Sequence, residues 1–271
     1  MNTGKKKNRT LLLFMVSIGI LLLLTTGIQA LGTSGDELPP NSTDTAVLEE
    51  MQTLAGRLSP LLQTAITNRI HQLKGDVYVE TKIVQSKNDD LEIDAELPIV
   101  PETNIAAAWV NADVKQSFLK AQLEVQDCRR EERGPVHPYS LFYRYEIPCN
   151  EGGLLSIVTE NYQYTGGAHG MTFKTAYNVD VSGGRLLLLR DFFPNRDNYL
   201  ADIKAKIKES LHTGPESECY FPDASETIDA YQGDFPFYIS GKNVVIFFHP
   251  YEIACYAAGF REFEIPWDVL P

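Results

Sequence analysis

Residues 76–100 carry the sequence pattern that decides the fold. They read DVYVETKIVQ (76–85), SKNDD (86–90) and LEIDAELPIV (91–100). The first and third segments alternate apolar and polar side chains and are rich in β-branched residues, which is typical of strands. The polar segment between them indicates a turn. Within the third segment Glu92, Asp94 and Glu96 recur at period two, which predicts one solvated face.

A helix and three further strands are expected after this pair. Asn104 precedes IAAAWVNADVKQSFLKAQL (105–123), where apolar residues recur at helical spacing, so we expect a helix capped by Asn104. That set comprises Ile105, Trp109, Val114, Phe118 and Leu119. The segments LEVQDC (123–128), SLFYRYEIPC (140–149) and GLLSIVTENYQYT (153–165) then read as strands.

The C-terminal part repeats the mixture of strands and helices. MTFKTAYNVDV (171–181) and RLLLL (185–189) predict a hairpin across Ser182-Gly183-Gly184, and residues 197–211 predict a helix. Short strands are expected at 235–240, 243–250 and 260–266. The pattern predicts an α+β fold of mostly antiparallel sheets with a few packed helices. The division into two subdomains, at 76–170 and 171–271, is implied by the family resemblance given below.

The N-terminal segment indicates export. Lys5, Lys6, Lys7 and Arg9 precede residues 11–31, which carry no charge and would be about 32 Å long as a helix, enough to span a bilayer. We expect an uncleaved single-pass anchor, with cleavage near Ala30 as the alternative. In both cases residues 32–271 lie outside the cytoplasm. Residues 32–75 then form a polar spacer and an amphipathic helix.

The charge distribution argues against a nucleic-acid partner. The chain has a formal net charge of −12, its first ten residues carry four positive charges, and residues 11–30 carry none. The remaining 241 residues therefore hold a net charge of −16. Binding to phosphates requires clustered Lys and Arg, so a part with this net negative charge argues against nucleic acid as a partner.

No sequence motif of catalysis, cofactor binding or metal binding is present. The chain has no nucleophile elbow, phosphate-binding loop or dinucleotide fingerprint, and its five histidines and four cysteines lack metal-ligand spacing. We therefore expect no cofactor, no metal and no catalysis by this chain alone.

Two segments are candidates for binding. The first is the loop with Tyr164, Gly166, Gly167 and His169, whose paired glycines suit either a binding loop or, more commonly, a strained turn. The second lies around residues 249–259. Pro250 can open a short helix there, and Gly259 can end it.

The second segment supplies three further candidate residues. Tyr251, Glu252 and Tyr256 would be ligand contacts in the functional interpretation. In the simpler one, which the pattern favours, Glu252 caps the helix and the tyrosines pack.

The order of these segments resembles a known exported bacterial module. The resemblance rests on four motifs, which are LPIV followed by Asn104, YTGGAHG (164–170), NVDV-SGG-RLLLLRDFF (178–193) and FHPYEIACYAAG (248–259). The chain is similar over roughly residues 76–268 to a PdaC-type N-terminal domain followed by a domain of unknown function. This pair occurs in the ectodomains of lysozyme-sensing anti-sigma factors of the RsiV type and beside the deacetylase domain of PdaC-like enzymes.

The resemblance implies a binding module at the cell envelope. Only ten residues precede the apolar run, so we expect no sigma-binding segment, and no deacetylase domain precedes Pro271. The expected partner is a cationic protein such as lysozyme, or peptidoglycan. The alternatives are an enzyme or accessory domain acting on wall polymers and a structural envelope protein.

Four cysteines in an exported chain permit two disulfides. We expect Cys128–Cys149, on what read as consecutive strands, and Cys219–Cys255, which would join the loop after helix 197–211 to the PYEIA segment. In the resembling proteins the position of Cys255 is commonly a proline, which also suggests a disulfide here.

Overall fold

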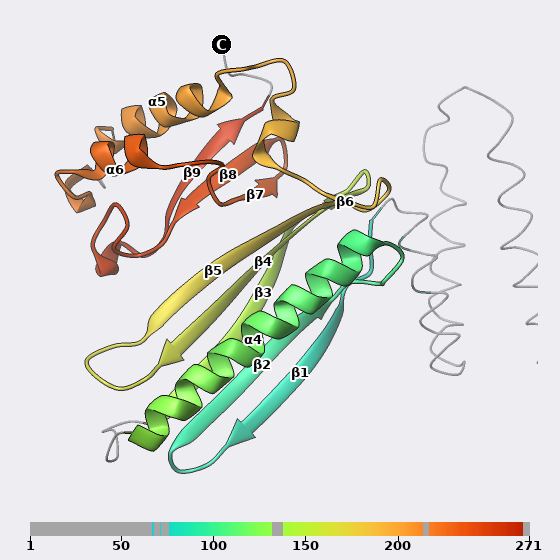
Figure 1. The fold of residues 1–271 in the computed structure, drawn as a ribbon, viewed down its shortest axis with the longest axis vertical. Helices are drawn as coiled ribbons and strands as arrows, with labels where there is room; N and C mark the ends of the chain where they lie inside the picture. The colour runs from blue at the N-terminus through green and yellow to red at the C-terminus, as the bar shows by residue number, and fades with distance from the viewer. Residues whose placement is uncertain (1–66, 68–70, 72–75, 132–137, 214–216, 268–271) are drawn as a thin grey trace, which may run out of the picture. The chain divides into compact units, whose positions relative to one another are not determined.

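The computed structural model describes residues 67, 71, 76–131, 138–213 and 217–267. Two sheets organise this part of the chain, which confirms the predicted α+β class with mostly antiparallel strands (Figure 1). The predicted segments 1–31 and 32–75, including the anchor, lie outside the described residues apart from positions 67 and 71. No helix within the described ranges has both the length and the apolar character that crossing a membrane requires.

The first sheet has six strands in sequential order. They are β1 (Glu80–Lys87), β2 (Leu91–Ile99), β3 (Tyr139–Glu151), β4 (Leu154–Tyr164), β5 (Met171–Asp180) and β6 (Arg185–Leu186). The predicted strand pair is β1 and β2, which lie antiparallel with Glu80 opposite Ile99. β1 is the edge of the sheet and is exposed along nearly all its length. β2 and β3 run parallel, so a crossover must join them.

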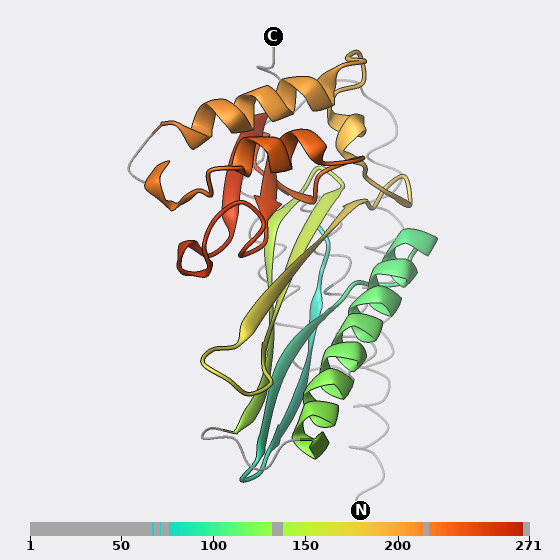
Figure 2. The same ribbon diagram turned by 60° about the vertical axis from the view of Figure 1, so that its left-hand side comes forward.

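That crossover is α4 (Ile105–Glu131), which covers one face of the sheet (Figures 1 and 2). Its expected cap is present, because the Ala107 backbone N–H donates to Asn104 Oδ1 at 3.0 Å. The strand predicted for LEVQDC (123–128) is wrong, because α4 continues through it. Ala121 and Val125 extend the buried helical face of Phe118.

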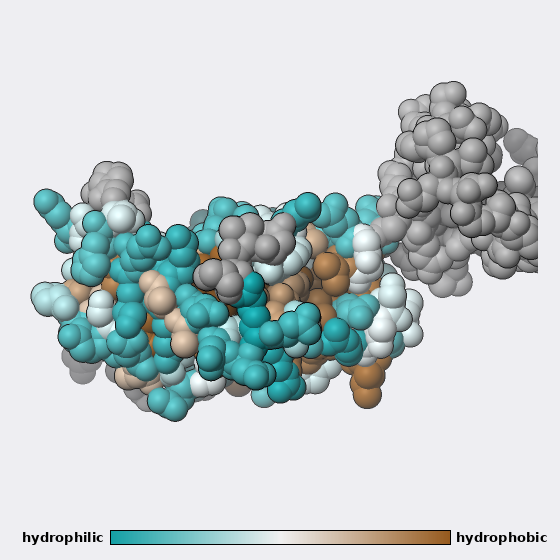
Figure 3. All heavy atoms as spheres, turned by 90° about the horizontal axis from the view of Figure 1, so that it is seen from above, coloured by the Kyte–Doolittle hydropathy of each residue, from teal (hydrophilic) through white to brown (hydrophobic). Residues whose placement is uncertain are grey.

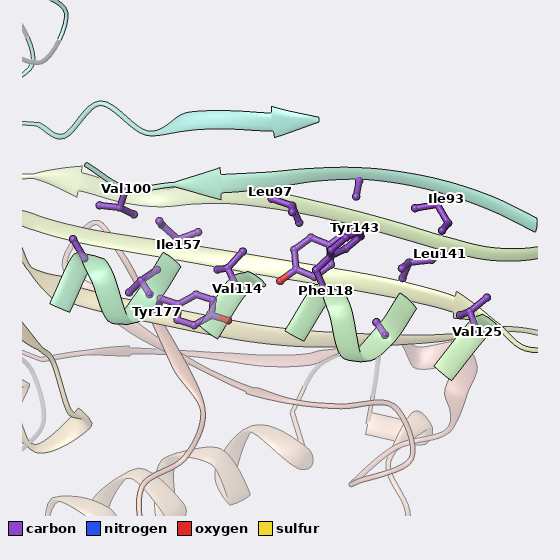
Figure 4. Packing of buried hydrophobic residues seen from close by; sticks show 14 of the residues in the cluster. Ile93, Leu97, Val100, Val114, Phe118, Val125, Leu141, Tyr143, Ile157 and Tyr177 are labelled. Atoms are coloured by element: carbon purple, nitrogen blue, oxygen red, sulfur yellow. The ribbon is translucent and has the colours of Figure 1, made fainter. Parts of the chain in front are cut away.

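The first core lies between α4 and the sheet (Figure 4). Phe118 from α4 meets Tyr143 from β3 edge to face, with ring centroids 6.1 Å apart. Val114 and Phe118 are core residues as the helical spacing predicts. Ile105, Trp109 and Leu119 instead lie on the exposed face of α4, so this helix is apolar on both sides.

β5 and β6 complete the first sheet, although both lie on the C-terminal side of the subdomain boundary predicted at residue 170. The expected hairpin is present and its turn carries Gly183 and Gly184, with the Gly183 backbone N–H donating to Asp180 Oδ1 at 2.7 Å. Only residues 185–186 of the second segment are strand.

The second sheet is smaller and has its own core. It contains β7 (Phe237–Ser240), β8 (Asn243–Phe248) and β9 (Arg261–Pro266), all antiparallel. The predicted helix is α5 (Tyr199–Leu211), and a short unexpected helix, α6 (Ala224–Ala230), lies beside it. Ile203 and Ile207 of α5 and Ile228 of α6 are completely buried against this sheet. The molecular face drawn in Figure 3 is mostly hydrophilic.

Buried hydrogen bonds join the two sheets. Ser156 of β4 donates its hydroxyl to Asn178 Oδ1 of β5 at 2.7 Å and accepts the Ile239 N–H of β7 at 3.1 Å. The Asn178 amide donates in turn to the Phe237 carbonyl at 2.8 Å. Since Ser156 is fully buried, these bonds satisfy groups that water cannot reach.

All four cysteines have free thiols in this structure. The predicted Cys128–Cys149 bridge is not formed in this structure. Cys128 lies near the end of α4, close in the chain to the start of β3, whereas Cys149 lies ten residues further along β3. At about 3.3 Å per strand residue, this separates them far beyond the reach of a disulfide. The two side chains also pack against different cores.

Candidate functional site

The loop between β4 and β5 and the segment after β8 lie against each other. In the loop, Tyr164 donates its hydroxyl to the Gly167 carbonyl at 3.0 Å. Gly166 and Gly167 have φ angles of 101° and 84°, which side chains rarely adopt. This geometry exposes Gly167, Ala168 and His169.

Three rings form the point of contact between the two segments. The imidazole of His169 stacks on the Tyr256 ring with centroids 4.1 Å apart, and the Tyr251 ring stacks on Tyr256 at 5.7 Å. The Tyr251 hydroxyl lies 3.4 Å from His169 Nε2. We call His169, Tyr251 and Tyr256 the aromatic cluster. The structure thus brings together two candidate segments that sequence analysis considered separately.

Residues 249–256 are held against β5 by hydrogen bonds. His249 Nε2 lies 3.2 Å from the backbone nitrogen and 3.0 Å from the backbone oxygen of Lys174. The Tyr256 hydroxyl donates to the Gly170 carbonyl at 2.8 Å. A side chain at position 170 would collide with the Tyr162 ring and a backbone carbonyl, so the close approach requires glycine there.

The short helix expected to begin at Pro250 is not formed. Tyr251 has a φ of 72°, and its N–H donates to the Ala254 carbonyl at 3.0 Å, which makes a turn instead. A 3-10 turn follows at Tyr256–Ala258 and ends at Gly259, whose φ is 64°. The helical expectation fails because the tight turn after Pro250 places Tyr251 outside helical geometry.

Glu252 stabilises this turn. Its Oε2 accepts the His249 backbone N–H at 2.6 Å and lies 3.8 Å from His249 Nδ1. Burial opposes ionisation of Glu252, but the side-chain and backbone hydrogen bonds from His249 outweigh it and lower the carboxyl pKa. The carboxylate therefore fixes the turn that presents Tyr251.

Charged residues line a neighbouring cavity of about 310 Å³ between the sheets. Lys174 Nζ lies 2.6 Å from Glu262 Oε1 and 3.1 Å from Glu160 Oε1, and it stands 4.4 Å from the centre of the Phe260 ring. Only 9% of the Lys174 side chain is exposed. The lysine is therefore committed to joining β4, β5 and β9.

The cavity is negative around Tyr238. The Tyr238 hydroxyl donates to Glu262 Oε2 at 3.2 Å. Burial raises the pKa of Tyr238, and the nearby carboxylates of Glu262, Glu264 and Glu146 raise it further. A tyrosine in this field stays neutral.

The same face of the first sheet carries an ion pair across β2 and β3. Arg144 on β3 reaches Asp94 Oδ2 at 2.6 Å. Hydrogen bonds from Gln85 and Arg144 lower the pKa of Asp94. Asp94 thus lies on the polar face that its period-two spacing predicts, but it is paired across strands.

The carboxyl groups with a resolved pKa shift all favour the ionised form. They are Asp94, Asp191 and Glu252, and the pKa of each is lowered. Within the described ranges no three His, Cys, Asp or Glu side chains are grouped to hold a metal ion. The site presents the exposed rings of His169 and Tyr251.

Sequence analysis did not select Lys174, His249, Tyr238 or Glu262 as site residues. The sequence shows only where they stand in the strand pattern, because Lys174 fits the alternation of β5 and His249 follows the apolar residues of β8. Neither pattern indicates that residues 174 and 249 meet.

The structure is a module of two parts. Polar contacts join its two sheets, and exposed rings from both parts lie beside these contacts. Residues 84–172 match the family model described as Deacetylase PdaC, and residues 190–268 match the model described as Protein of unknown function (DUF3298). The resemblance expected from the sequence is therefore confirmed. Together the matches indicate an extracytoplasmic type of module whose function is open.

Two solved structures are similar to this chain. A DUF3298 family protein from Pseudomonas aeruginosa PAO1 is 17% identical with a TM-score of 0.52, over 72% of this chain and 93% of that one. A member of the same family from Bacteroides fragilis NCTC 9343 is 19% identical over the same shares, with a TM-score of 0.47. At this identity the first likeness shows the fold alone. No curated protein matches the chain.

Proposed function

We propose that this chain is a binding module of the cell envelope that docks a basic protein of the lysozyme type at the aromatic cluster and has no catalysis of its own. In this proposal residues 11–31 anchor it in the membrane, or are removed near Ala30, and residues 32–271 lie outside the cytoplasm.

The backbone of Tyr251 is the observation that carries the proposal. Among the described residues it is the one non-glycine residue with a positive φ, a conformation that costs a side chain on the order of 1 kcal/mol. Its side chain is nevertheless 52% exposed, so its burial offsets little of this cost. A strained, exposed aromatic residue is better suited to contacting a partner than to stabilising the fold.

Charge supports a basic partner. Residues 31–271 hold a net charge of −16, and Glu146 and Glu264 are exposed around Tyr238. Complementary charge mainly raises the association rate, and Tyr residues supply affinity once the surfaces meet. Lysozymes are typically basic, so their charge is complementary to this acidic surface.

The stacked rings favour one second candidate, a wall glycan. The faces of sugar rings pack on exposed aromatic rings, and Tyr251, which is 52% exposed and stacks nearly parallel on Tyr256 at 28°, offers such a ring. A glycan would depend on the rings but little on salt, whereas a basic protein would depend on both.

The test is a titration of a basic lysozyme, and separately of solubilised peptidoglycan, against the full-length chain in detergent at low and at about 0.15 M salt. We expect lysozyme to bind at both salt concentrations and binding to weaken about tenfold or more in Tyr251→Ala, which removes a ring that is 52% exposed. Trp109→Ala is the matched control, because Trp109 is similarly exposed, at 48%, on α4.

Lack of binding to both ligands would overturn the proposal and favour a structural protein. Equal binding to any unrelated basic protein would reduce it to charge attraction. Turnover of the glycan that is lost in Glu160→Gln would establish an enzyme instead.

A further inference from the structure

Cys219 and Cys255 occupy opposed positions across a short antiparallel contact. Tyr220 and Ala254 form an antiparallel bridge, and the Phe221 N–H donates to the Ile253 carbonyl at 2.9 Å. The next opposed pair in this register is Cys219 with Cys255. Opposed residues of antiparallel strands have Cα atoms about 4.5–5.5 Å apart, which lies within the range that disulfides span.

Both thiols are accessible beside this contact. Cys219 ends the 3-10 turn Ser217–Cys219, and Cys255 has extended backbone before the 3-10 turn Tyr256–Ala258, so the two cysteines flank the Tyr220–Ala254 bridge. Tyr220 stacks on Phe263 with centroids 6.4 Å apart, and Ala254 is 1% exposed, so that pair faces the protein. Cys255 is exposed and Cys219 is partly exposed.

We propose that Cys219 and Cys255 form a disulfide when the protein meets an oxidising environment, and that this bond fixes the segment presenting Tyr256. One thiolate attacks an external disulfide such as oxidised glutathione and releases one thiol. The second cysteine then attacks the mixed disulfide, which forms the protein S–S bond and releases a second thiol. Two electrons and two protons pass to the external disulfide.

The bond would act directly beside the aromatic cluster. Tyr256 follows Cys255 in the chain, and its ring stacks on His169. A covalent link at position 255 limits how far Tyr256 can move from the His169 ring. This effect on binding rests on the proposed function, but formation of the bond does not.

The first experiment is peptide mapping of the full-length chain, incubated with oxidised glutathione and then alkylated without reduction. We expect one cross-linked peptide pair containing residues 219 and 255, lighter by two hydrogen atoms, and alkylated Cys128 and Cys149. Alkylation of all four cysteines would overturn the proposal. Glutathione attached at either position without a cross-link would overturn it as well.

The second experiment measures thermal unfolding before and after reduction. We expect reduction to lower the melting temperature by about 4–12 °C in the wild type and in Cys128→Ser, because the link restricts the unfolded chain. Cys219→Ser and Cys255→Ser should melt at the reduced value with or without reductant. A cross-link that leaves the melting temperature unchanged would overturn the claim that it fixes the segment.

Lysozyme binding separates the two proposals. If oxidised and reduced chains both fail to bind while the cross-link forms, the proposed function fails and the disulfide stands. If both bind equally well, the effect of the bond on the aromatic cluster is overturned.

Discussion

Tyr256 lies with its ring against the imidazole of His169, at a centroid separation of 4.1 Å and an interplanar angle of 20°. His169 lies within the segment matched by one family model and Tyr256 within the segment matched by the other. The aromatic cluster therefore exists only where both segments fold together, and neither segment alone contains the proposed site.

Replacing Tyr251 by glycine separates binding from stability. Glycine relieves the positive φ but removes the stacking on Tyr256, and the two effects are each about 1 kcal/mol. We expect the free energy of unfolding to change by less than about 1 kcal/mol, while affinity for the basic partner falls about tenfold. Calorimetric titration and urea unfolding measure the two quantities.

Tyr251→Phe is the control for this pair of measurements. It keeps the ring and loses only the hydroxyl that lies 3.4 Å from His169 Nε2, so affinity should fall less than in Tyr251→Gly. A glycine variant that binds like the wild type would contradict the role of this ring.

Lys174→Met should destabilise the fold and make its stability depend on pH. The change leaves Glu160 and Glu262 facing each other without the ammonium between them. Because both carboxylates are partly exposed, we expect a loss of about 2–3 kcal/mol at pH 7 in urea unfolding. Lys120→Met, on the exposed face of α4, should change stability by less than about 0.5 kcal/mol.

The pH dependence of the Lys174→Met variant gives a second check. Repulsion between the two carboxylates acts only while both are ionised. The stability deficit of the variant should therefore be smaller at pH 4 than at pH 7. A deficit that is equal at pH 4 and pH 7 would mean that lost packing, rather than charge, causes it.

Glu252→Gln should weaken the turn at neutral pH only. The Glu252 pKa is lowered in the folded state, so its carboxylate contributes stability above the ordinary glutamate pKa and loses it as the pH falls through the folded pKa. We expect the variant to be less stable than the wild type at pH 7 and the difference to shrink as the pH falls through the folded pKa of Glu252. Glu80→Gln, at the exposed start of β1, should show no such convergence in parallel unfolding curves.

Ser156→Ala should weaken the joint between the sheets. The change deprives the Ile239 N–H of its acceptor and Asn178 Oδ1 of its donor, both in buried surroundings. We expect a loss of about 2–3 kcal/mol in the free energy of unfolding. Ser140→Ala, whose exposed hydroxyl bonds only to the Pro138 carbonyl, is the control and should cost less than about 1 kcal/mol. Equal effects of the two variants would contradict a linking role for Ser156.

The strands and the main helix could be predicted because their patterns are local. Alternation revealed β1 and β2, and Asn104 marked the start of α4 through its capping oxygen. The end of α4 was misread because Leu123 and Val125 alternate with polar residues as a strand would. The helical spacing from Phe118 through Ala121 to Val125 continued there, and it determines burial.

The two segments of the candidate site could be predicted from the sequence, but the contact between them could not. Paired glycines and tyrosines beside turn residues can be recognised in the sequence, so both candidate binding segments could be selected. Their contact depends on β5 pairing with β4 and on His249 reaching the Lys174 backbone. Such contacts between distant residues have no periodic signature, which also explains why Lys174 and Glu262 were missed.

The exposed edge strand β1 affects how this module can meet a partner. Its outward positions carry Lys82 and Lys87, and charged side chains on an edge discourage another chain from adding a strand there. The opposite edge, β6, is only two residues long and gives little backbone to pair with. Recognition by main-chain strand addition is therefore disfavoured at both edges of the first sheet.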